Sequence, residues 1–528
     1  MGTTPTAAAE PCVIVIFGAS GDLTHRKLIP SLYDLDRQGA LPRGASILGV
    51  SRTPMSDDDF RAKVKPSVQK FSGHFDESRW SGSGNPGGFA QRVHYLPLDA
   101  TDPEAFGALQ DRINSLAKEA GIVKPSGTPN VLFYLSVSPD LYEPIIANIG
   151  SAGLVVEGKR WCSLNPSESS WQRIIIEKPF GSDLKSAASL NRALGRVFEE
   201  EATFRIDHYL GKELVQNILV LRFANTIFEP VWNRNYVDHI QVTAAETVGV
   251  GSRAANFYDT AGAMRDMIQS HLLQVLAMVA IEPPSSYNAD AIMREKIKLF
   301  LAAPPVPRDR IPQWGAFGRY GPDAASGEPA YQNENGVDAG RRTETYAAMK
   351  IAIDNWRWAG VPFYLRSGKK LAAKLTEIVV QFKQPPTSLF RNLDPAAADR
   401  PGNRLIINIA PREGISLRIE GKVPGGGGGG LHIDSAKLDL DYVERFGGEP
   451  IEAYGPLILD AIRGDRTLYK HRDEVESGWR ICDPFLHHDA LRAGIQEYPA
   501  NSWGPASGDE LMARDGRRWH NPAPSDVR

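Results

Sequence analysis

Short apolar runs alternate with amphipathic stretches over the first two hundred residues. CVIVIF (12–17) and NVLFYLSVSP (130–139) are continuous apolar runs, as is typical of strands that are buried on both faces. RKLIPSLYDLDRQG (26–39) repeats leucines at helical spacing, and ASILGVSR (45–52) and RIIIEKPFG (173–181) predict further strands. Strands and helices that alternate in this way build a parallel sheet with right-handed crossovers. The sequence therefore predicts a doubly wound α/β domain.

The pattern changes after Arg205. KELVQNILVLRFAN (212–225) and a second stretch over about 256–280 are helical. Several strand-like pieces then follow without helices between them: TYAAMKIAID, FYLRSGKKL, TEIVVQFKQ, RLIINIAP and GISLRIEGK. Consecutive strands favour an antiparallel sheet. We therefore expect two domains, an α/β domain over 1–205 and an α+β domain over 206–528 with a large, mostly antiparallel sheet.

GASGDL (18–23) lies between the first strand and the first helix. Gly18 permits a tight turn, Gly21 lets the helix approach, and the free N–H groups of the helix start suit a pyrophosphate. Only a G-x-x-G core is present, so an ordinary strand-to-helix turn is the alternative interpretation. The position in the first such turn of a doubly wound pattern favours a dinucleotide site.

The end of the second strand bears on which dinucleotide binds. NAD sites commonly place a carboxylate there, but this strand runs into Arg52, and no acid follows before Asp57. A guanidinium binds a 2′-phosphate through two charge-assisted hydrogen bonds, so Arg52 favours NADP. Lys27 is a weaker candidate for the same charge, and a plain surface arginine is the alternative for Arg52.

Two further segments carry candidate chemistry. If the helix that follows RIDHYLGKE (205–213) reaches back far enough, His208 and Lys212 share a face and suit a phosphate dianion. The alternative is a solvated helix start capped by Asp207. His271 lies in an otherwise apolar helical run, where histidine is more often a hydrogen-bonded core residue. A neutral, partly desolvated imidazole that is oriented by a carboxylate is also what a general base for a sugar hydroxyl requires.

Composition narrows the function classes. Sixty basic and 63 acidic residues among 528 leave a net charge of −3, which favours neither nucleic-acid nor membrane partners. Cys12, Cys162 and Cys482 predict neither a disulfide framework nor a zinc site, so no metal is expected. No apolar run is long enough to span a bilayer, and a cytoplasmic protein is predicted. The glycine run at 425–430 is interpreted as a loop insertion.

Six separated motifs together resemble the glucose-6-phosphate dehydrogenase family. They are GASGDL, EKPFG, RIDHYLGKE with VQN, RFAN, RDM with QSHLLQ, and VPFYLRSGKKL, and the tail resembles that of bacterial members. The resemblance implies a Rossmann-like domain followed by a large antiparallel sheet, with assembly as a homodimer or homotetramer through that sheet. It also implies NADP-linked oxidation of D-glucose 6-phosphate at C1 to 6-phospho-D-glucono-1,5-lactone, the first step of the oxidative pentose phosphate pathway.

The resemblance assigns roles to individual residues. The general base falls on His271 and its orienting carboxylate on Asp207. The implied substrate contacts are Lys178, His208, Tyr209, Lys212, Glu246, Asp266, Lys369 and Lys374. The implied coenzyme contacts are Gly18, Ser20, Gly21, Asp22, Leu23, Arg52 and Lys178.

Two departures and two rival functions accompany this interpretation. THRK follows the glycine turn where relatives carry a run of lysines, and Ser270 precedes His271 where many carry an amide. One rival is a dehydrogenase for another hexose or hexose phosphate. The other is a non-catalytic sensor of NADP or sugar phosphate on the same fold, against which the presence of both Asp207 and His271 weighs.

Overall fold

The computed structural model divides the chain into two compact units. It describes residues 9–82, 87–156, 169–251, 258–338, 340–387, 389–390, 392, 400–424, 432–447 and 454–523. The first unit comprises residues 1–211, 286–293 and 451–476, and the second comprises 212–285, 294–450 and 477–528. The chain thus returns to the first unit twice after leaving it. Cys162 and the glycine run at 425–430 lie outside the described residues.

The first unit is built on a seven-stranded sheet with the order β15-β6-β5-β4-β1-β2-β3. Its strands are β1 Val13–Phe17, β2 Ser46–Ser51, β3 Val93–Pro97, β4 Val131–Leu135, β5 Gln172–Ile176, β6 Thr203–Ile206 and β15 Tyr469–Lys470. The first six pair in parallel, and β15 joins β6 in the antiparallel sense. Every residue of β1, β4 and β5 is buried, as their apolar runs predict. The order reverses at β1, between β4 and β2, and this reversal is where doubly wound folds bind nucleotides.

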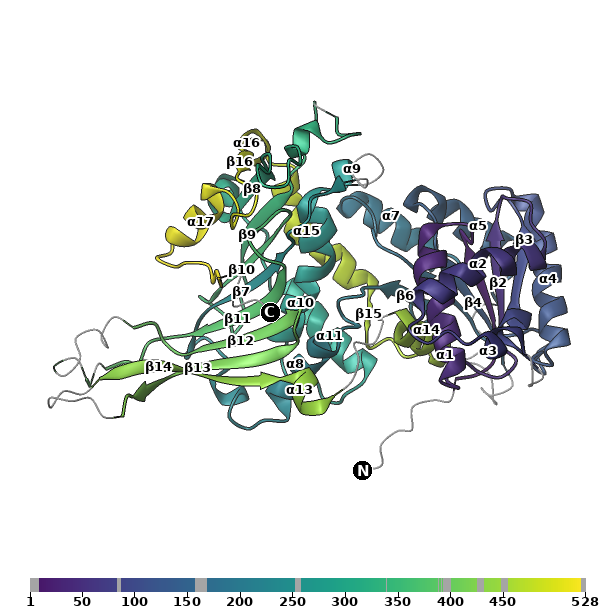
Figure 1. The fold of residues 1–528 in the computed structure, drawn as a ribbon, viewed down its shortest axis with the longest axis horizontal. Coiled ribbons are helices and arrows are strands. Elements are labelled where there is room, and N and C mark those ends of the chain that lie inside the picture. Colours follow the sequence, from purple (N-terminus) through teal and green to yellow (C-terminus); the bar gives the residue numbers. More distant parts are fainter. Residues whose placement is uncertain are drawn as a thin grey trace. The chain divides into compact units, whose positions relative to one another are not determined.

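Helices surround this sheet (Figure 1). They are α1 Ile29–Arg37, α2 Asp57–Phe71, α3 Glu77–Ser81, α4 Phe106–Glu119, α5 Tyr142–Ser151, α7 Leu184–Gly195 and α14 Tyr454–Arg463. α4 packs on β1 and β2, and the late helix α14 packs on α1. Two helices, α11 Ala289–Leu301 and α15 Arg472–Leu486, have residues in both units.

The second unit is built on a nine-stranded sheet with the order β14-β13-β12-β11-β7-β10-β9-β8-β16. Its strands are β7 Val237–Ala245, β8 Gly315–Tyr320, β9 Tyr346–Ala352, β10 Pro362–Gly368, β11 Leu375–Phe382, β12 Arg404–Ala410, β13 Gly414–Lys422, β14 Ile433–Asp441 and β16 Gln496–Tyr498. The pairing is antiparallel except between β7 and β10 and between β8 and β16. The two sheets confirm the predicted fold class.

One long helical segment lies across the middle of the second sheet. It consists of α9 Asp259–Ala263, the π-helical segment η10 Met264–Leu272, and α10 Leu273–Ala280. η10 packs on β7, β9 and β10, and α8 Glu213–Phe223 packs on α10 and β12. The remaining α-helices of the described residues are α12 Ile311–Trp314, α13 Tyr442–Phe446, α16 Asp489–Ala493 and α17 Ala506–Ala513.

Sequence periodicity predicted one helix from about residue 256 to 280, and this was wrong in one respect. Gly262 adopts φ 69° and ψ 171°, which interrupts the helix after its first turn. A Cβ atom at Gly262 would lie 2.3 Å from a carboxylate oxygen of Glu344, so that side chain occupies the space that any larger residue would need. Apolar spacing cannot reveal such a break, because the spacing continues on both sides of it.

Candidate functional site

The glycine turn after β1 has the geometry of a phosphate-binding turn. Gly18 has φ +84°, and a Cβ atom there would lie 2.0 Å from the carbonyl oxygen of Ser136 at the end of β4. The N–H of Gly21 donates to the Gly18 carbonyl at 2.9 Å, and the Thr24 hydroxyl donates to the same carbonyl at 3.1 Å. These contacts close the turn at the reversal of strand order and leave Ser20 exposed there. This turn, which runs from Gly18 to Thr24 and is called the glycine cradle below, fits the pyrophosphate of a dinucleotide, because glycine allows the backbone to approach so closely.

The helix after this turn begins earlier than the leucine spacing predicted. Residues from Asp22 onward are helical, and Thr24–Leu28 form a π-helical segment that continues into α1. Asp22 is exposed and pairs with Arg26 at 3.5 Å, while Leu23 is half-buried. The second strand, β2, ends at Ser51, and Arg52 follows it as an exposed side chain. The structure thus puts Gly18 and Arg52 after neighbouring parallel strands, at the same edge of the sheet.

A buried acid lies beside Lys178 at the end of β5. Glu177 accepts a hydrogen bond from the Tyr134 hydroxyl at 2.5 Å, and its backbone carbonyl accepts one from Tyr142 at 3.0 Å. Burial raises the pKa of Glu177 to about 7, even though the hydrogen bond from Tyr134 and the charge of Lys178 act in the opposite direction. Lys178 itself is half-buried. Lys178 was among the predicted site residues and Glu177 was not, although an acid at the carboxyl end of a predicted parallel strand was a signal for it.

Asp207 follows β6 and is completely buried. One of its carboxylate oxygens accepts the backbone N–H of Tyr209 at 3.0 Å, which closes a turn rather than starting a helix. The other oxygen lies 3.0 Å from the ammonium nitrogen of Lys470, a residue of β15 that is also buried. No local sequence signal pointed to Lys470, because it reaches Asp207 only through the pairing of β15 with β6.

The predicted helical face that His208 and Lys212 would share is not formed. α8 begins at Glu213, and Lys212 precedes it with an extended backbone at φ −77° and ψ 134°. Residues 207–211 form turns, so an i, i+4 relationship on a helix does not hold for this pair. The rings of His208 and Tyr209 lie 5.4 Å apart; His208 is half-buried and Tyr209 is buried. The hydrogen bond from the Tyr209 N–H to the Asp207 carboxylate stabilises a turn at these residues in place of a helix.

The candidate base lies in the second unit, on the π-helical segment η10. His271 is 1% exposed, and Asp266 on the same segment is also buried. The Ser270 hydroxyl donates to the backbone carbonyl of Asp266, one turn earlier. η10 and the segment after the glycine turn are both π-helical, a feature often found at functional sites.

Glu246 and Lys369 are brought together by the parallel pair β7 and β10. In this pair Ala245 lies opposite Gly368, so the residues that follow each strand are neighbours. The Lys369 ammonium donates to the Glu246 carboxylate and lies 5.6 Å from the ring centroid of Tyr258. Burial raises the pKa of Tyr258 well above its usual range, with Asp266 and Glu246 adding to the effect. Tyr258 was not among the predicted site residues, and its hydroxyl has no hydrogen-bond partner among the described residues.

Lys374 differs from the other predicted substrate residues. It lies between β10 and β11 and is exposed. Lys369, five positions earlier, is 3% exposed and held by Glu246.

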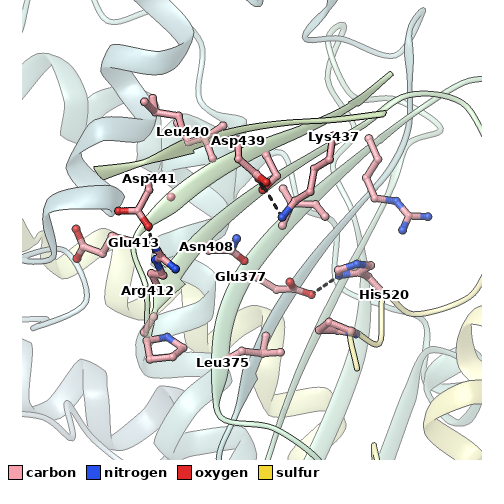
Figure 2. Close-up of a pocket in the computed structure, with 18 of the residues that line it drawn as sticks. Leu375, Glu377, Asn408, Arg412, Glu413, Lys437, Asp439, Leu440, Asp441 and His520 are labelled. Carbon is pink, nitrogen blue, oxygen red and sulfur yellow. Dashed lines mark hydrogen bonds and ion pairs between the residues drawn. The ribbon is translucent and has the colours of Figure 1, made fainter. Parts of the chain in front are cut away.

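A separate groove of about 900 Å³ runs over the sheet of the second unit (Figure 2). β11, β12, β13, β14 and the segment 520–523 line it, and none of the predicted site residues does. Three pairs of its charged groups lie close together: Glu377 with His520 at 2.9 Å, Lys437 with Asp439 at 3.0 Å, and Arg412 with Asp441. This groove therefore does not contain the residues that carry candidate chemistry.

The described residues lack two kinds of feature. They contain no helix with both the length and the apolar character that crossing a membrane requires. They also contain no group of three or more His, Cys, Asp or Glu residues placed to hold a metal ion.

Two family models together match almost the whole chain. "Glucose-6-phosphate dehydrogenase, NAD binding domain" matches residues 15–217, and "Glucose-6-phosphate dehydrogenase, C-terminal domain" matches residues 219–520.

Curated proteins and solved structures agree with these matches. Glucose-6-phosphate 1-dehydrogenase of Aggregatibacter actinomycetemcomitans is 42% identical over 517 residues, which are 98% of each chain. The protein of that name from Mycolicibacterium smegmatis is 41% identical over 527 residues, 99% of this chain and 100% of its own. A solved glucose-6-phosphate dehydrogenase in complex with its substrate glucose-6-phosphate is 33% identical, with a TM-score of 0.84 over 99% of this chain and 100% of that one. The crystal structure of glucose-6-phosphate 1-dehydrogenase from Mycobacterium avium is 32% identical, with a TM-score of 0.78 over 97% and 99%.

Proposed function

Because the chain belongs to the glucose-6-phosphate dehydrogenase family, we propose that it oxidises D-glucose 6-phosphate at C1 to 6-phospho-D-glucono-1,5-lactone and passes the hydride to NADP⁺. This reaction is the first step of the oxidative pentose phosphate pathway. The observation that carries the proposal is the full-length similarity to enzymes of this name, together with a glycine cradle at the strand-order reversal.

The cofactor is a nicotinamide dinucleotide, and we propose NADP in particular. The bound dinucleotide supplies the hydride acceptor. The turn and helix start hold the pyrophosphate, through Gly18, Ser20, Gly21, Asp22 and Leu23. Arg52 binds the 2′-phosphate; its exposure after β2 and the absence of an acid before Asp57 support this role. Lys178 contacts both the substrate and the nicotinamide end.

In the proposed mechanism, His271 removes the proton from the C1 hydroxyl as the hydride leaves C1. Asp207 accepts a hydrogen bond from the other imidazole N–H and stabilises the imidazolium that forms. The burial of both residues supports these roles, because a desolvated, oriented imidazole is an effective base. General-base assistance of this kind contributes about 10²–10⁴ in rate.

The remaining residues hold the sugar phosphate. Cationic and hydroxyl groups bind the phosphate: His208, Tyr209, Lys212, Lys369 and Lys374. Glu246 and Asp266 accept hydrogen bonds from sugar hydroxyls. Binding the remote phosphate positions C1 for transfer, which is how energy from a non-reacting group raises the rate. The ion pair of Lys369 with Glu246 supports this assignment, since it fixes the lysine in place before substrate arrives.

We further propose that the chain works in the cytoplasm as a homodimer or homotetramer assembled through the second sheet. Apolar side chains on its edge strand β14 and on the helix after it support this, because exposed apolar patches mark interfaces. Leu438, Val443 and Phe446 are 54%, 51% and 69% exposed. Light scattering of the wild type and of Phe446→Ser tests the assembly, and an unchanged mass in the variant speaks against this surface.

Initial rates test the proposed function. The absorbance of the reduced coenzyme, NADPH or NADH, is followed with glucose 6-phosphate, free glucose or mannose 6-phosphate, each with NADP⁺ and with NAD⁺. Turnover that requires glucose 6-phosphate and is fastest with NADP⁺ is the expected result. Turnover with another hexose in its place supports the rival dehydrogenase. Binding of NADP⁺ without turnover of any sugar supports the rival sensor.

A further inference from the structure

A lysine that no family motif contains is paired with the candidate orienting acid. The ammonium of Lys470 lies 3.0 Å from a carboxylate oxygen of Asp207, and the two side chains are 3% and 0% exposed. The same ammonium lies 5.7 Å from the ring centroid of Phe180, on the loop after β5. Both residues belong to the first unit, although they are distant in the chain.

The fold brings Lys470 to this place by strand pairing. Lys470 lies opposite Arg205, and Tyr469 lies opposite Ile206, in the antiparallel pair of β15 with β6. The Tyr469 ring packs edge-on against Phe204, with centroids 4.9 Å apart. The lysine is therefore set against the end of β6, where Asp207 follows, by main-chain register as well as by charge.

The other ionisable groups of the adjoining elements have partners of their own. Arg205 of β6 forms a two-point pair with Glu200, at 2.5 and 3.1 Å. Glu177 after β5 accepts a hydrogen bond from Tyr134. After β15, His471 lies 3.4 Å from Asp473 and 3.8 Å from Glu200.

The backbone N–H groups around this pair add a further constraint. His471 donates its backbone N–H to the buried Glu474 at 3.2 Å, so the residue after Lys470 is also fixed. Lys178, at the end of β5, is the other lysine of these elements, and its proposed contacts are with substrate and coenzyme. The Lys470 ammonium is paired with Asp207 at 3.0 Å.

We propose that Lys470 is a positioning residue for Asp207, holding its carboxylate ionised and oriented for the proposed base His271. This inference rests on the proposed function. A carboxylate that is fully buried favours its neutral form unless an opposite charge lies close by, and a neutral acid does not stabilise an imidazolium. The ammonium of Lys470 supplies that charge, and the Tyr209 N–H fixes the second oxygen.

The test is the pH dependence of kcat/KM for glucose 6-phosphate in the full-length enzyme. The acid limb of this profile is the range in which kcat/KM falls as pH falls. In Lys470→Met this limb is expected to move to higher pH by about one unit, which is the lower end of the pKa shift that a close opposite charge causes. Losing the ammonium moves the acid limb to higher pH in two ways. Asp207 gains its proton at higher pH, and an Asp207 that stays ionised without its counter-charge makes His271 harder to deprotonate. KM for glucose 6-phosphate at the pH plateau is expected to stay within about twofold, because Lys470 does not contact substrate in the proposed mechanism.

Three further variants make the test specific. Lys470→Gln keeps a hydrogen-bond donor without the charge and is expected to shift the limb as Lys470→Met does; it also serves if the methionine variant does not fold. Lys470→Arg keeps the charge and is expected to retain the wild-type limb. Lys350→Met removes another lysine–aspartate pair, with Asp515 at 2.6 Å, and is expected to leave the limb unchanged.

The outcomes separate this inference from the proposed function. A wild type without glucose 6-phosphate turnover refutes the proposed function itself. An active wild type whose acid limb is unmoved in a folded Lys470→Met or Lys470→Gln variant overturns the role of Lys470. An equal displacement in Lys470→Arg and Lys470→Gln also overturns it, because charge would then not be the cause.

Discussion

Replacing Gly18 by alanine tests whether the first turn depends on close backbone approach. The new Cβ would lie 2.0 Å from the Ser136 carbonyl oxygen and 2.8 Å from its carbonyl carbon. β1 and β4 pair directly, with Phe17 opposite Leu135, so their ends would have to separate by about 1 Å to reach even a 3.0 Å contact. The substitution therefore strains two strands of the buried parallel sheet.

The size of the effect follows from two contributions. A non-glycine residue in the left-handed region costs about 1–2 kcal/mol. Overpacking of this kind costs about 1–3 kcal/mol more. We expect Gly18→Ala to lower the free energy of unfolding of the first unit by about 3 kcal/mol. For a unit of this size the melting temperature would fall by roughly 6–12 °C.

Gly39 provides a matched control. It follows α1 with φ +72°, and a Cβ atom there would have nothing within 4 Å. Gly39→Ala therefore carries the conformational cost alone, about 1 kcal/mol or roughly 2–4 °C.

Thermal unfolding with and without NADP⁺ is the assay. Gly18→Ala is expected to lose most of the stabilisation that added NADP⁺ gives the wild type, whereas Gly39→Ala is expected to keep it. A Gly18→Ala protein that melts within 1 °C of Gly39→Ala and still responds to NADP⁺ would refute the reasoning about the cradle.

Three further predictions concern the base, the coenzyme and pH. His271→Asn is expected to lower kcat at least about a hundredfold with a modest change in KM, as steady-state kinetics would measure; near-normal turnover would remove it from the base role. Arg52→Ala is expected to raise KM for NADP⁺ far more than KM for NAD⁺, and equal losses would show that the arginine does not bind the 2′-phosphate. The pKa of Glu177 is about 7 in the folded protein and about 4.5 in the unfolded chain. The contribution of protonated Glu177 to the free energy of unfolding is therefore present below pH 4.5 and is lost as pH rises to 7. The unfolding free energy of Glu177→Gln minus that of the wild type is therefore expected to rise by on the order of 2–3 kcal/mol between pH 4.5 and 8. A difference that does not change with pH in denaturant unfolding would contradict this.

Local patterns in the sequence were sufficient for elements whose cause is local. The apolar run of β1, the glycines of the next turn and the strand β2, which ends just before Arg52, lie within about forty residues, and the structure forms all three. The apolar run around His271 likewise predicted a buried helix, and His271 is buried. The change of pattern after Arg205 predicted the two domain types, and the family motifs implied the same two types.

Strand pairing between distant segments was decided by the tertiary structure alone. The sequence does not state that β7 and β10 run in parallel, and that pairing is what puts Glu246 beside Lys369. It also does not state that β15 returns to β6 and carries Lys470 to Asp207. Periodicity records which face of a strand is buried, not which strand lies next to it, and the partner is selected by packing across the whole sheet. The close approach of Gly262 to the carboxylate of Glu344 is likewise a contact between distant segments that periodicity does not record.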